Sequence, residues 1–318
     1  MASEVLLAVV SSRGSVWTKE LLKHVPDAQV WPDRVTDLDA VKFMIVMKQP
    51  EGLLEKCPNL VAVNGLGHGV DYITKEEGKL KPDVQILRVV DTLMAERMAY
   101  WNLWAIINCQ RRCEEYLQAQ RAHRWSHGEV EDLSSEDNAD FRVGILGFGA
   151  LGGELASVLR KNGYPVSAWA RSKRDVEGVA FFAGKEQLPA FLKDLRVLVG
   201  LLPLTPETTG LVDKDLLAML PRGAFFINAG RGQSHKTADL LEALDSDQLA
   251  GAVLDVFEEE PLAKDSPLWD HPKVRVFPHV SSWTPIAPGV QQTLENWEAI
   301  RQGRAVAPER VVKRHLGY

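Results

Sequence analysis

Phe141-Arg-Val-Gly-Ile-Leu-Gly-Phe-Gly-Ala-Leu-Gly-Gly153 is the stretch of sequence that decides the fold. An apolar run leads directly into Gly147-x-Gly149-x-x-Gly152, and apolar residues then recur at helical spacing until Asn162-Gly163. This order indicates a strand, a tight glycine turn and a helix. In such a turn the first glycine makes the bend, the second lets a pyrophosphate approach the backbone, and the third lets helix and strand pack closely. Because the helix N-terminus also offers free N–H groups to an anion, the stretch predicts dinucleotide binding.

The overall composition is that of an ordinary globular protein. The 318 residues favour two domains, and the formal net charge of −6 gives no reason to expect nucleic acid or an anionic membrane as a partner. No apolar run reaches the roughly 18 residues that a membrane-spanning helix needs, and the N-terminus lacks the basic start of a signal peptide. Three cysteines argue against a disulfide framework. Cys109 and Cys113 have no matching ligands nearby, so we predict free thiols, no metal site and a cytoplasmic location.

Short apolar runs alternate with helical patterns along the whole chain, which predicts parallel sheets covered by helices on both faces. A run from Asp91 to about Trp125 lacks proline and glycine and predicts one long helix, capped by Asp91 or Thr92. A polar connection follows, and a last helix at about 288–302 is expected to return to the first domain. The predicted strands cover residues 5–12, 41–47, 60–63, 84–90, 143–146, 165–170, 197–202, 224–229, 252–256 and 274–277.

Charged residues follow three of these strands at the point where each strand ends. Arg231 follows 224–229, Asp255 and Glu260 lie at and beyond the end of 252–256, and His279 follows 274–277. In open α/β sheets, ligands bind beyond the carboxyl ends of the strands. A single histidine or arginine in such a place is more often structural. Three such residues at neighbouring strand ends, beside a dinucleotide turn, predict an active site.

Five motifs resemble those of the D-isomer-specific 2-hydroxyacid dehydrogenases, in the same order, from about residue 40 to the C-terminus. They are Gly147-Phe-Gly-Ala-Leu-Gly152, Leu202-Pro-Leu-Thr-Pro-Glu-Thr208, Asn228-Ala-Gly-Arg-Gly232, Asp255-Val-Phe-Glu-Glu-Glu-Pro261 and Pro278-His279. The resemblance implies a catalytic set of Arg231, Glu260 and His279. Arg231 would pair the substrate carboxylate and polarise the keto oxygen, and His279 would donate a proton to that oxygen. Glu260 would orient the imidazole and favour its charged form.

The resemblance also implies the fold, the further contacts and the assembly. We expect an α/β protein of two Rossmann-like, doubly wound parallel-sheet domains: a discontinuous flavodoxin-like substrate domain (1–95 with 285–318) and an NAD(P)-binding domain (96–284). A homodimer formed largely through the nucleotide domains is implied. The apolar segment 99–107 either supplies part of its interface or is buried between the chain's own two domains. The expected substrate-binding residues are Lys48, His68 and Gly69, with Arg231 and His279. The expected cofactor-binding residues are Gly147, Gly149, Ala150, Leu151, Gly152, Arg171, Ser172, Lys173, Leu202, Pro203, Thr208, Ala229, Gly230 and Asp255.

The choice of cofactor is indicated by the residues that follow the strand 165–170. An NAD-binding unit places an acid about 20 positions after the first glycine to hold the ribose 2′-hydroxyl. Here Ala170 stands at that place, and Arg171, Ser172 and Lys173 offer two cations and a hydroxyl. An acid would repel a 2′-phosphate, whereas these residues can bind one. The sequence therefore predicts that NADPH is preferred and that NADH is possible.

Further segments look like the glyoxylate/hydroxypyruvate reductase branch: Met94-Ala-Glu-Arg-Met98, Tyr116-Leu-Gln-Ala-Gln120, Trp125 and Gly317-Tyr318. One departure is Met47, where that branch usually has tryptophan, so the preferred keto acid stays open. The leading hypothesis is an NADPH-dependent reductase of a short 2-keto acid, forming the D-2-hydroxy acid. The alternatives are a regulatory protein that senses dinucleotides, and an NAD-dependent dehydrogenase of the phosphoglycerate or D-lactate type.

Overall fold

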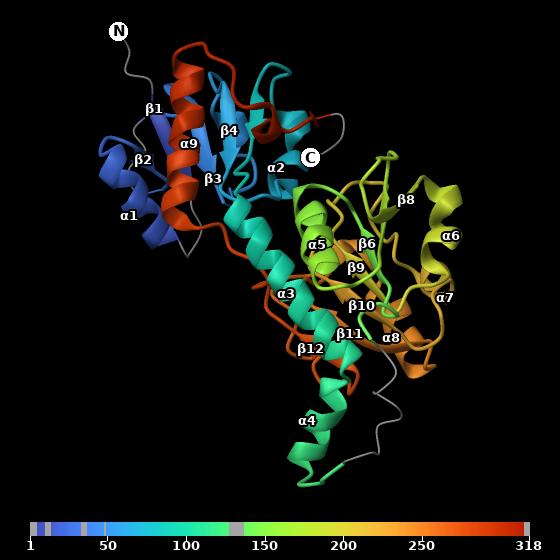
Figure 1. Ribbon diagram of the computed structural model, residues 1–318. Helices are drawn as coiled ribbons and strands as arrows, with labels where there is room; N and C mark the ends of the chain where they lie inside the picture. The colour runs from blue at the N-terminus through green and yellow to red at the C-terminus, as the bar shows by residue number, and fades with distance from the viewer. Residues whose placement is uncertain (1–4, 10–13, 33–36, 48, 127–136, 315–318) are drawn as a thin grey trace. The chain divides into compact units, whose positions relative to one another are not determined.

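The computed structural model describes residues 5–9, 14–32, 37–47, 49–126 and 137–314 (Figure 1). The chain divides into two compact units, residues 1–94 with 283–318 and residues 95–282. Each unit is built on its own parallel sheet. The predicted α/β class with two doubly wound parallel sheets is confirmed.

The first unit contains a sheet with the strand order β2-β1-β3-β4-β5, which is the flavodoxin-like order. Alternate residues of β3 and β4 face opposite sides, and each side has its own apolar cluster. α1 and α9 pack against each other. The elements of this unit are β1 (Val5–Val9), α1 (Gly14–His24), β2 (Gln29–Val30), β3 (Val41–Val46), η1 (Leu54–Lys56), β4 (Ala62–Gly65), α2 (Asp71–Thr74), η2 (Glu77–Lys79), β5 (Gln85–Leu87), α9 (Ile286–Arg301) and η5 (Pro308–Arg310).

The second unit contains a sheet with the order β12-β11-β10-β9-β6-β7-β8. Counted from β6, this is the Rossmann order with a seventh strand added, and the order reverses between β6 and β9. α3 (Thr92–Gln110) begins in the last residues of the first unit and lies mostly in the second. The other elements of the second unit are α4 (Cys113–Arg121), β6 (Val143–Leu146), α5 (Ala150–Lys161), β7 (Val166–Ala170), β8 (Val179–Ala183), η3 (Lys185–Gln187), α6 (Leu188–Leu192), β9 (Val197–Gly200), α7 (Lys214–Ala218), β10 (Ala224–Asn228), η4 (Gly232–Ser234), α8 (Thr237–Asp245), β11 (Leu249–Leu254) and β12 (Val274–Val276).

The prediction of one long helix from Asp91 to Trp125 is wrong. α3 ends at Gln110, and Arg112 takes a left-handed conformation with φ of 49° before α4 begins. After the break, α4 contacts the start of β12: Glu114 forms an ion pair with Arg275, and Gln118 donates to the carbonyl of Pro272. The predicted cap at the start of α3 is present, since Asp91 accepts from the amide of Leu93 at 2.7 Å.

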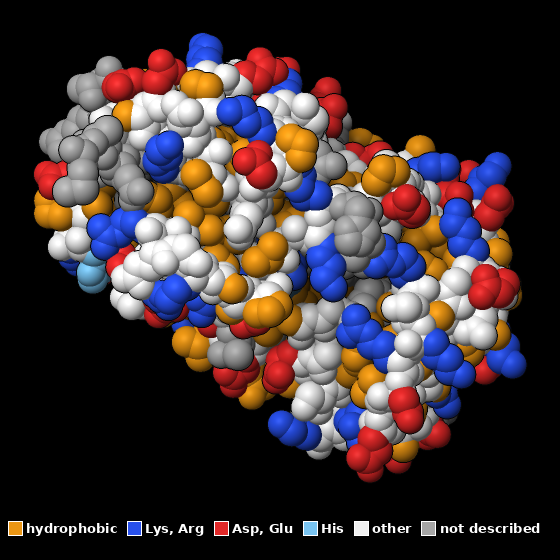
Figure 2. Space-filling view, turned by 90° about the horizontal axis from the view of Figure 1, so that it is seen from above, with side chains coloured by type: hydrophobic (Ala, Val, Ile, Leu, Met, Phe, Trp, Pro, Cys, Tyr) orange, Lys and Arg blue, Asp and Glu red, His pale blue; other side chains and the backbone are white. Residues whose placement is uncertain are grey.

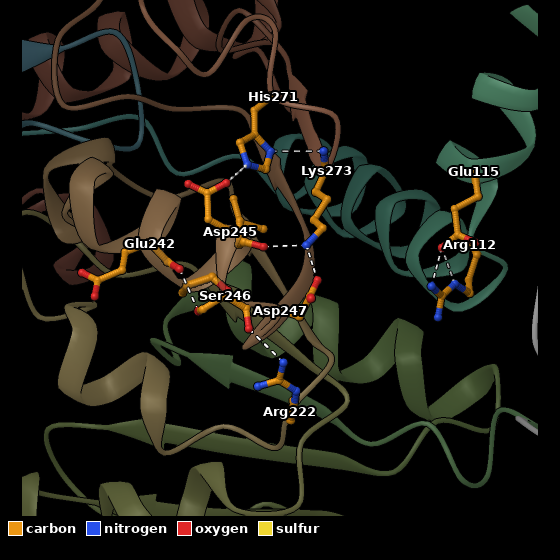
Figure 3. A network of polar contacts seen from close by, with 11 residues as sticks. Arg112, Glu115, Arg222, Glu242, Asp245, Ser246, Asp247, His271 and Lys273 are labelled. Atoms are coloured by element: carbon orange, nitrogen blue, oxygen red, sulfur yellow. Dashed lines mark hydrogen bonds and ion pairs between the residues drawn. The ribbon is translucent and has the colours of Figure 1, made fainter. Parts of the chain in front are cut away.

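A group of polar contacts ties the end of α8 to the beginning of β12 (Figure 3). Lys273 Nζ donates to the carbonyl of Leu244 and pairs with Asp247, both at 2.5 Å, and His271 Nε2 lies 3.3 Å from Asp245. The carbonyl of Leu244, in the last turn of α8, thus accepts from both Lys273 and the backbone amide of Asp247. These contacts fix the start of β12, the strand that leads to His279.

The surface carries both signs of charge. On the face shown in Figure 2, Lys and Arg side chains are mixed with Asp and Glu, which agrees with the modest net charge of −6. No helix in the described part of the chain is long and apolar enough to cross a membrane. Among the described residues, no three His, Cys, Asp or Glu side chains form a group that could hold a metal ion.

Candidate active site

The carboxyl ends of β10, β11 and β12 lie side by side in the sheet of the second unit, and each is followed by one of the predicted site residues. Arg231 follows β10, Asp255 follows β11, and His279 follows β12. β10 and β11 are short and mostly buried, whereas β12 contains Arg275 and has only Val274 buried. The sheet therefore brings these residues together although up to 48 positions separate them (279 − 231).

His279 and Glu260 form a direct contact. His279 Nδ1 lies 2.8 Å from Glu260 Oε2, and Glu260 Oε1 accepts from the backbone amide of Phe257 at 3.0 Å. Burial raises the pKa of the Glu260 carboxyl, but hydrogen bonds from His279 and Phe257 and the charges of His279 and Arg231 outweigh it and lower that pKa overall. Glu260 is thus held as a carboxylate that orients the His279 ring.

Asp255 holds the backbone that follows His279. Its side chain is fully buried, and its two oxygens accept from the amides of Val280 at 2.7 Å and Ser281 at 3.0 Å. Its own carbonyl accepts from the amide of His279 at 2.9 Å. His279 has a φ of 55°, a conformation that is uncommon for a residue with a side chain. The hydrogen bonds between Asp255 and residues 279–281 fix this backbone conformation of His279. The predicted contact between Asp255 and the cofactor stays a prediction.

The loop that carries Arg231 is fixed by a small buried network that sequence reasoning missed. The side-chain nitrogen Nδ2 of Asn228 donates to the backbone carbonyl of Arg231 at 3.1 Å and lies 3.0 Å from His235 Nδ1. Ser234 Oγ donates to the same carbonyl at 2.7 Å. At Gly232 an added Cβ would lie 1.9 Å from the backbone of Phe257, so only glycine fits there. The motif 228–232 contains the signal, but only the fold shows its bonding.

The glycine turn has the geometry that its spacing predicts. Gly147 has a φ of 108°, and a Cβ there would lie 2.6 Å from the carbonyl oxygen of Leu201. A Cβ on Gly152 would lie 2.3 Å from the carbonyl oxygen of Gly147, whereas one on Gly149 would meet nothing within 4 Å. Ala150 and Leu151 then begin α5. The turn therefore leaves room above Gly149 and presents a helix N-terminus to it.

The remaining predicted cofactor residues lie at the ends of β7, β9 and β10. Arg171, Ser172 and Lys173 are exposed directly after β7, and Leu202 and Pro203 follow β9. Thr208 is buried and donates to the carbonyl of Pro203 at 2.7 Å. Ala229 and Gly230 are buried after β10, and a Cβ on Gly230 would lie 3.1 Å from the backbone of Leu201 and Leu202.

The loop after β7 also acts electrostatically on the segment after β9. The carboxyl of Glu207 accepts hydrogen bonds from its own backbone amide and from the side chain of Thr205, and both lower its pKa. Loss of hydration acts in the opposite direction. The charges of Arg171 and Lys185 lower the pKa further. The positive charge predicted to bind a 2′-phosphate thus lies near an acid of this chain.

The predicted substrate residues of the first unit lie after β4. His68 and Gly69 are half-buried in the glycine-rich loop, and the carbonyl of Gly67 accepts from the amide of Val89 at 3.3 Å. Lys48 lies outside the described residues. The assignment of these residues to substrate binding stays a prediction.

The chain is similar to a known family and to several solved structures. Residues 103–281 match the family model of the D-isomer specific 2-hydroxyacid dehydrogenase NAD binding domain. A D-isomer specific 2-hydroxyacid dehydrogenase from Xanthobacter autotrophicus, solved with NADPH, is 36% identical with a TM-score of 0.88, over 99% of this chain and 100% of that one. An NADPH-dependent glyoxylate/hydroxypyruvate reductase from Sinorhizobium meliloti, solved with NADP and sulfate, is 34% identical with a TM-score of 0.88, over 99% and 100%.

A third similar structure is a probable 2-hydroxyacid dehydrogenase from Rhizobium etli, solved with NADP, HEPES and L(+)-tartaric acid. It is 31% identical with a TM-score of 0.88, over 99% of each chain. A Rossmann-type sheet with a glycine turn at its switch point defines a dinucleotide-dependent α/β protein. The chain belongs to the D-isomer specific 2-hydroxyacid dehydrogenase family and is an oxidoreductase with that family's NAD-binding domain.

Proposed function

We propose that this protein reduces a short 2-keto acid of the glyoxylate or hydroxypyruvate type to the D-2-hydroxy acid, with NADPH as the preferred cofactor. The observation that supports this most directly is the contact of His279 with Glu260 beside Arg231, at adjoining strand ends of a Rossmann sheet. The similarity to a glyoxylate/hydroxypyruvate reductase supports the substrate class. A regulatory protein that only senses dinucleotides would have no need of this arrangement.

Each residue of the site has its own role in the proposed reduction. Glu260 holds Nδ1 of His279, so Nε2 is the ring nitrogen that delivers a proton to the keto oxygen. Arg231 pairs with the substrate carboxylate through its forked N–H groups and polarises the carbonyl. The loop amides of His68 and Gly69 are proposed to bind the same carboxylate. A bound reduced nicotinamide supplies the hydride to the carbonyl carbon.

The residues of the second unit fit such a cofactor. The open space at Gly149 and the start of α5 suit a pyrophosphate. Ala170 presents no acid at the end of β7, and Arg171, Ser172 and Lys173 follow it on the surface. These residues are proposed to hold the 2′-phosphate.

Turnover tests the proposed function. Purified protein with NADPH should lose the absorbance of the reduced nicotinamide when glyoxylate or hydroxypyruvate is added. A panel that includes phosphohydroxypyruvate and pyruvate, each with NADPH and with NADH, separates this function from the phosphoglycerate and D-lactate alternatives. Binding of NADPH without turnover on any member of the panel would instead support a dinucleotide sensor.

Replacing Arg171 with alanine should weaken NADPH binding by ~10–100-fold, because a hydrogen bond to a charged group is lost. NADH binding should be nearly unchanged, since NADH lacks the 2′-phosphate. Fluorescence titration of both cofactors measures the two effects. Arg174→Ala, which removes an exposed cation three positions further along the same loop, is the matched control. Equal losses for both cofactors in Arg171→Ala would remove this loop from cofactor selection.

A homodimer is proposed as the assembly, and we expect light scattering at micromolar concentration to give about twice the chain mass of 35.4 kDa. Tyr100, Trp104 and Ile107 on α3 and Tyr116 on α4 are exposed large apolar side chains. The spacing of Tyr100, Trp104 and Ile107 places them on one face of α3, and exposed apolar faces often mark interaction sites. Ile107→Lys should then shift the mass toward the monomer, while Val61→Lys, at an exposed position in the first unit, should not. A monomeric wild-type protein would contradict the proposal.

A further inference from the structure

A chain of buried polar side chains connects α9 to the end of β4, directly before the glycine-rich loop of residues 65–69. Asn64 is fully buried, and its Oδ1 accepts from Asn296 Nδ2 at 2.8 Å. Asn64 Nδ2 donates to the carbonyl of Gly65 at 2.9 Å and to Thr293 Oγ1 at 3.3 Å. Asn296 and Thr293 are also buried and lie one turn apart on α9.

The chain of contacts continues to the surface. Asn296 Oδ1 accepts from Arg310 Nη1 at 3.2 Å, and Arg310 pairs with Glu295 at 3.0 Å. Thr293 Oγ1 donates to the carbonyl of Gly289 at 2.8 Å. Since a buried polar group is costly unless it is hydrogen-bonded, this arrangement is stable only when its members keep these positions. It therefore fixes the amide of Asn64 in one orientation.

A second connection from the same helix reaches the segment that bonds to the loop. Gln292 makes two hydrogen bonds with the backbone of Val90, accepting from its amide at 2.6 Å and donating to its carbonyl at 2.9 Å. The neighbouring Val89 donates its amide to the carbonyl of Gly67 at 3.3 Å. α9 thus holds both the residue before the loop and the segment that bonds to its middle.

We propose that Asn64, Asn296 and Gln292 are positioning residues that set the peptide orientation of the loop 65–69 for substrate binding. The inference depends on the proposed function, in which the amides of His68 and Gly69 bind the substrate carboxylate. Backbone amides bind an anion well only when they are fixed in advance, because glycine-rich segments otherwise lose much entropy on binding. The side chains of α9 provide this order without touching the substrate.

Asn296→Asp tests the inference, because it keeps the size and the acceptor for Arg310 but places an oxygen where Asn64 Oδ1 needs a donor. The KM for the keto acid should rise by ~5–100-fold, the range for a buried group left without its partner. The Kd for NADPH should be unchanged. Hydrogen–deuterium exchange of the peptide that covers 65–69 should become faster in the protein without substrate. Gln292→Glu, which loses only the bond to the Val90 carbonyl, is the milder second variant.

Val290→Ala is the matched control, since it removes buried volume from the same helix without touching the polar chain. It should lower thermal stability and leave KM and the exchange of 65–69 as in the wild type. The inference would be overturned if both Asn296→Asp and Gln292→Glu kept the wild-type KM and the wild-type exchange of 65–69. It would also be overturned if Val290→Ala changed KM and exchange as much as Asn296→Asp does. A wild-type protein that turns over no 2-keto acid would contradict the proposed function, while the exchange measurement would still decide whether α9 orders the loop.

Discussion

Replacing His279 with alanine is expected to lower kcat for keto-acid reduction by ~10²–10⁴-fold, the range for loss of a positioned general acid. Glu260 occupies Nδ1 at 2.8 Å, and the side chain of His279 is 46% exposed, so its ring is both oriented and accessible. Asp255 holds the amides on the C-terminal side of the residue, and that support does not depend on the imidazole. NADPH binding should therefore be retained. Steady-state kinetics and a cofactor titration on the same preparation measure both quantities.

His24→Ala is the control for this experiment. The His24 side chain has the same exposed fraction, 46%, but it lies in the first unit at the end of α1, where it contacts Glu20. It should have wild-type kcat. Near-normal turnover in His279→Ala at neutral pH would remove the imidazole from the mechanism, and loss of NADPH binding would assign it to the cofactor site instead.

The positions of Arg231, Asp255 and His279 could be predicted because they depend on a local pattern. Each follows a short predicted strand, and parallel strands place their carboxyl ends at one edge of a sheet. The glycine turn was predictable for the same reason, since Gly147 and Gly152 stand where a side chain would meet the backbone. In both cases the physical requirement lies within a few residues of the signal.

The polar network between α9 and β4 could not be predicted, because its partners are far apart in the sequence. Asn64 and Asn296 are separated by 232 positions, and nothing in either neighbourhood indicates the other. β8 was missed for a related reason: Val179–Ala183 is an edge strand whose residues are mostly half-buried, so it lacks the strong apolar run of a central strand. The contact of α4 with β12 likewise joins residues that are distant in the sequence, Glu114 and Arg275.

His235 lies in the network around Asn228 that fixes the Arg231 loop. The residue is 1% exposed, and the ring packs against Phe226 with 5.9 Å between centroids. The side-chain nitrogen Nδ2 of Asn228 can only donate, so His235 Nδ1 accepts. The His235 ring is therefore neutral, with its proton on Nε2. Burial lowers the pKa of His235 from 6.5 to about 4, and the charge of Glu258 opposes this shift.

The lowered pKa predicts how stability depends on pH. Between the folded pKa of about 4 and the unfolded value of 6.5, the unfolded chain binds a proton that the folded chain does not, so stability rises with pH in this window. The stability that depends on the neutral His235 ring is fully present above the unfolded-state pKa. It is lost as the pH falls toward the folded-state pKa. At 1.36 kcal/mol per pH unit, the whole shift corresponds to about 3 kcal/mol of the free energy of unfolding.

His235→Phe should remove this pH dependence, because phenylalanine fills the same space without titrating, and Asn228 keeps Arg231 and Ser234 as partners. Between about pH 6.5 and pH 5, the free energy of unfolding of the wild type should fall by about 2 kcal/mol more than that of the variant. Urea unfolding at several pH values measures both slopes, and other titrating groups cancel in the difference. His24→Phe, at an exposed site, should keep the wild-type slope. If His235→Phe and the wild type lose stability in parallel, the buried ring is protonated in the folded protein and its contact with Asn228 has been assigned the wrong donor.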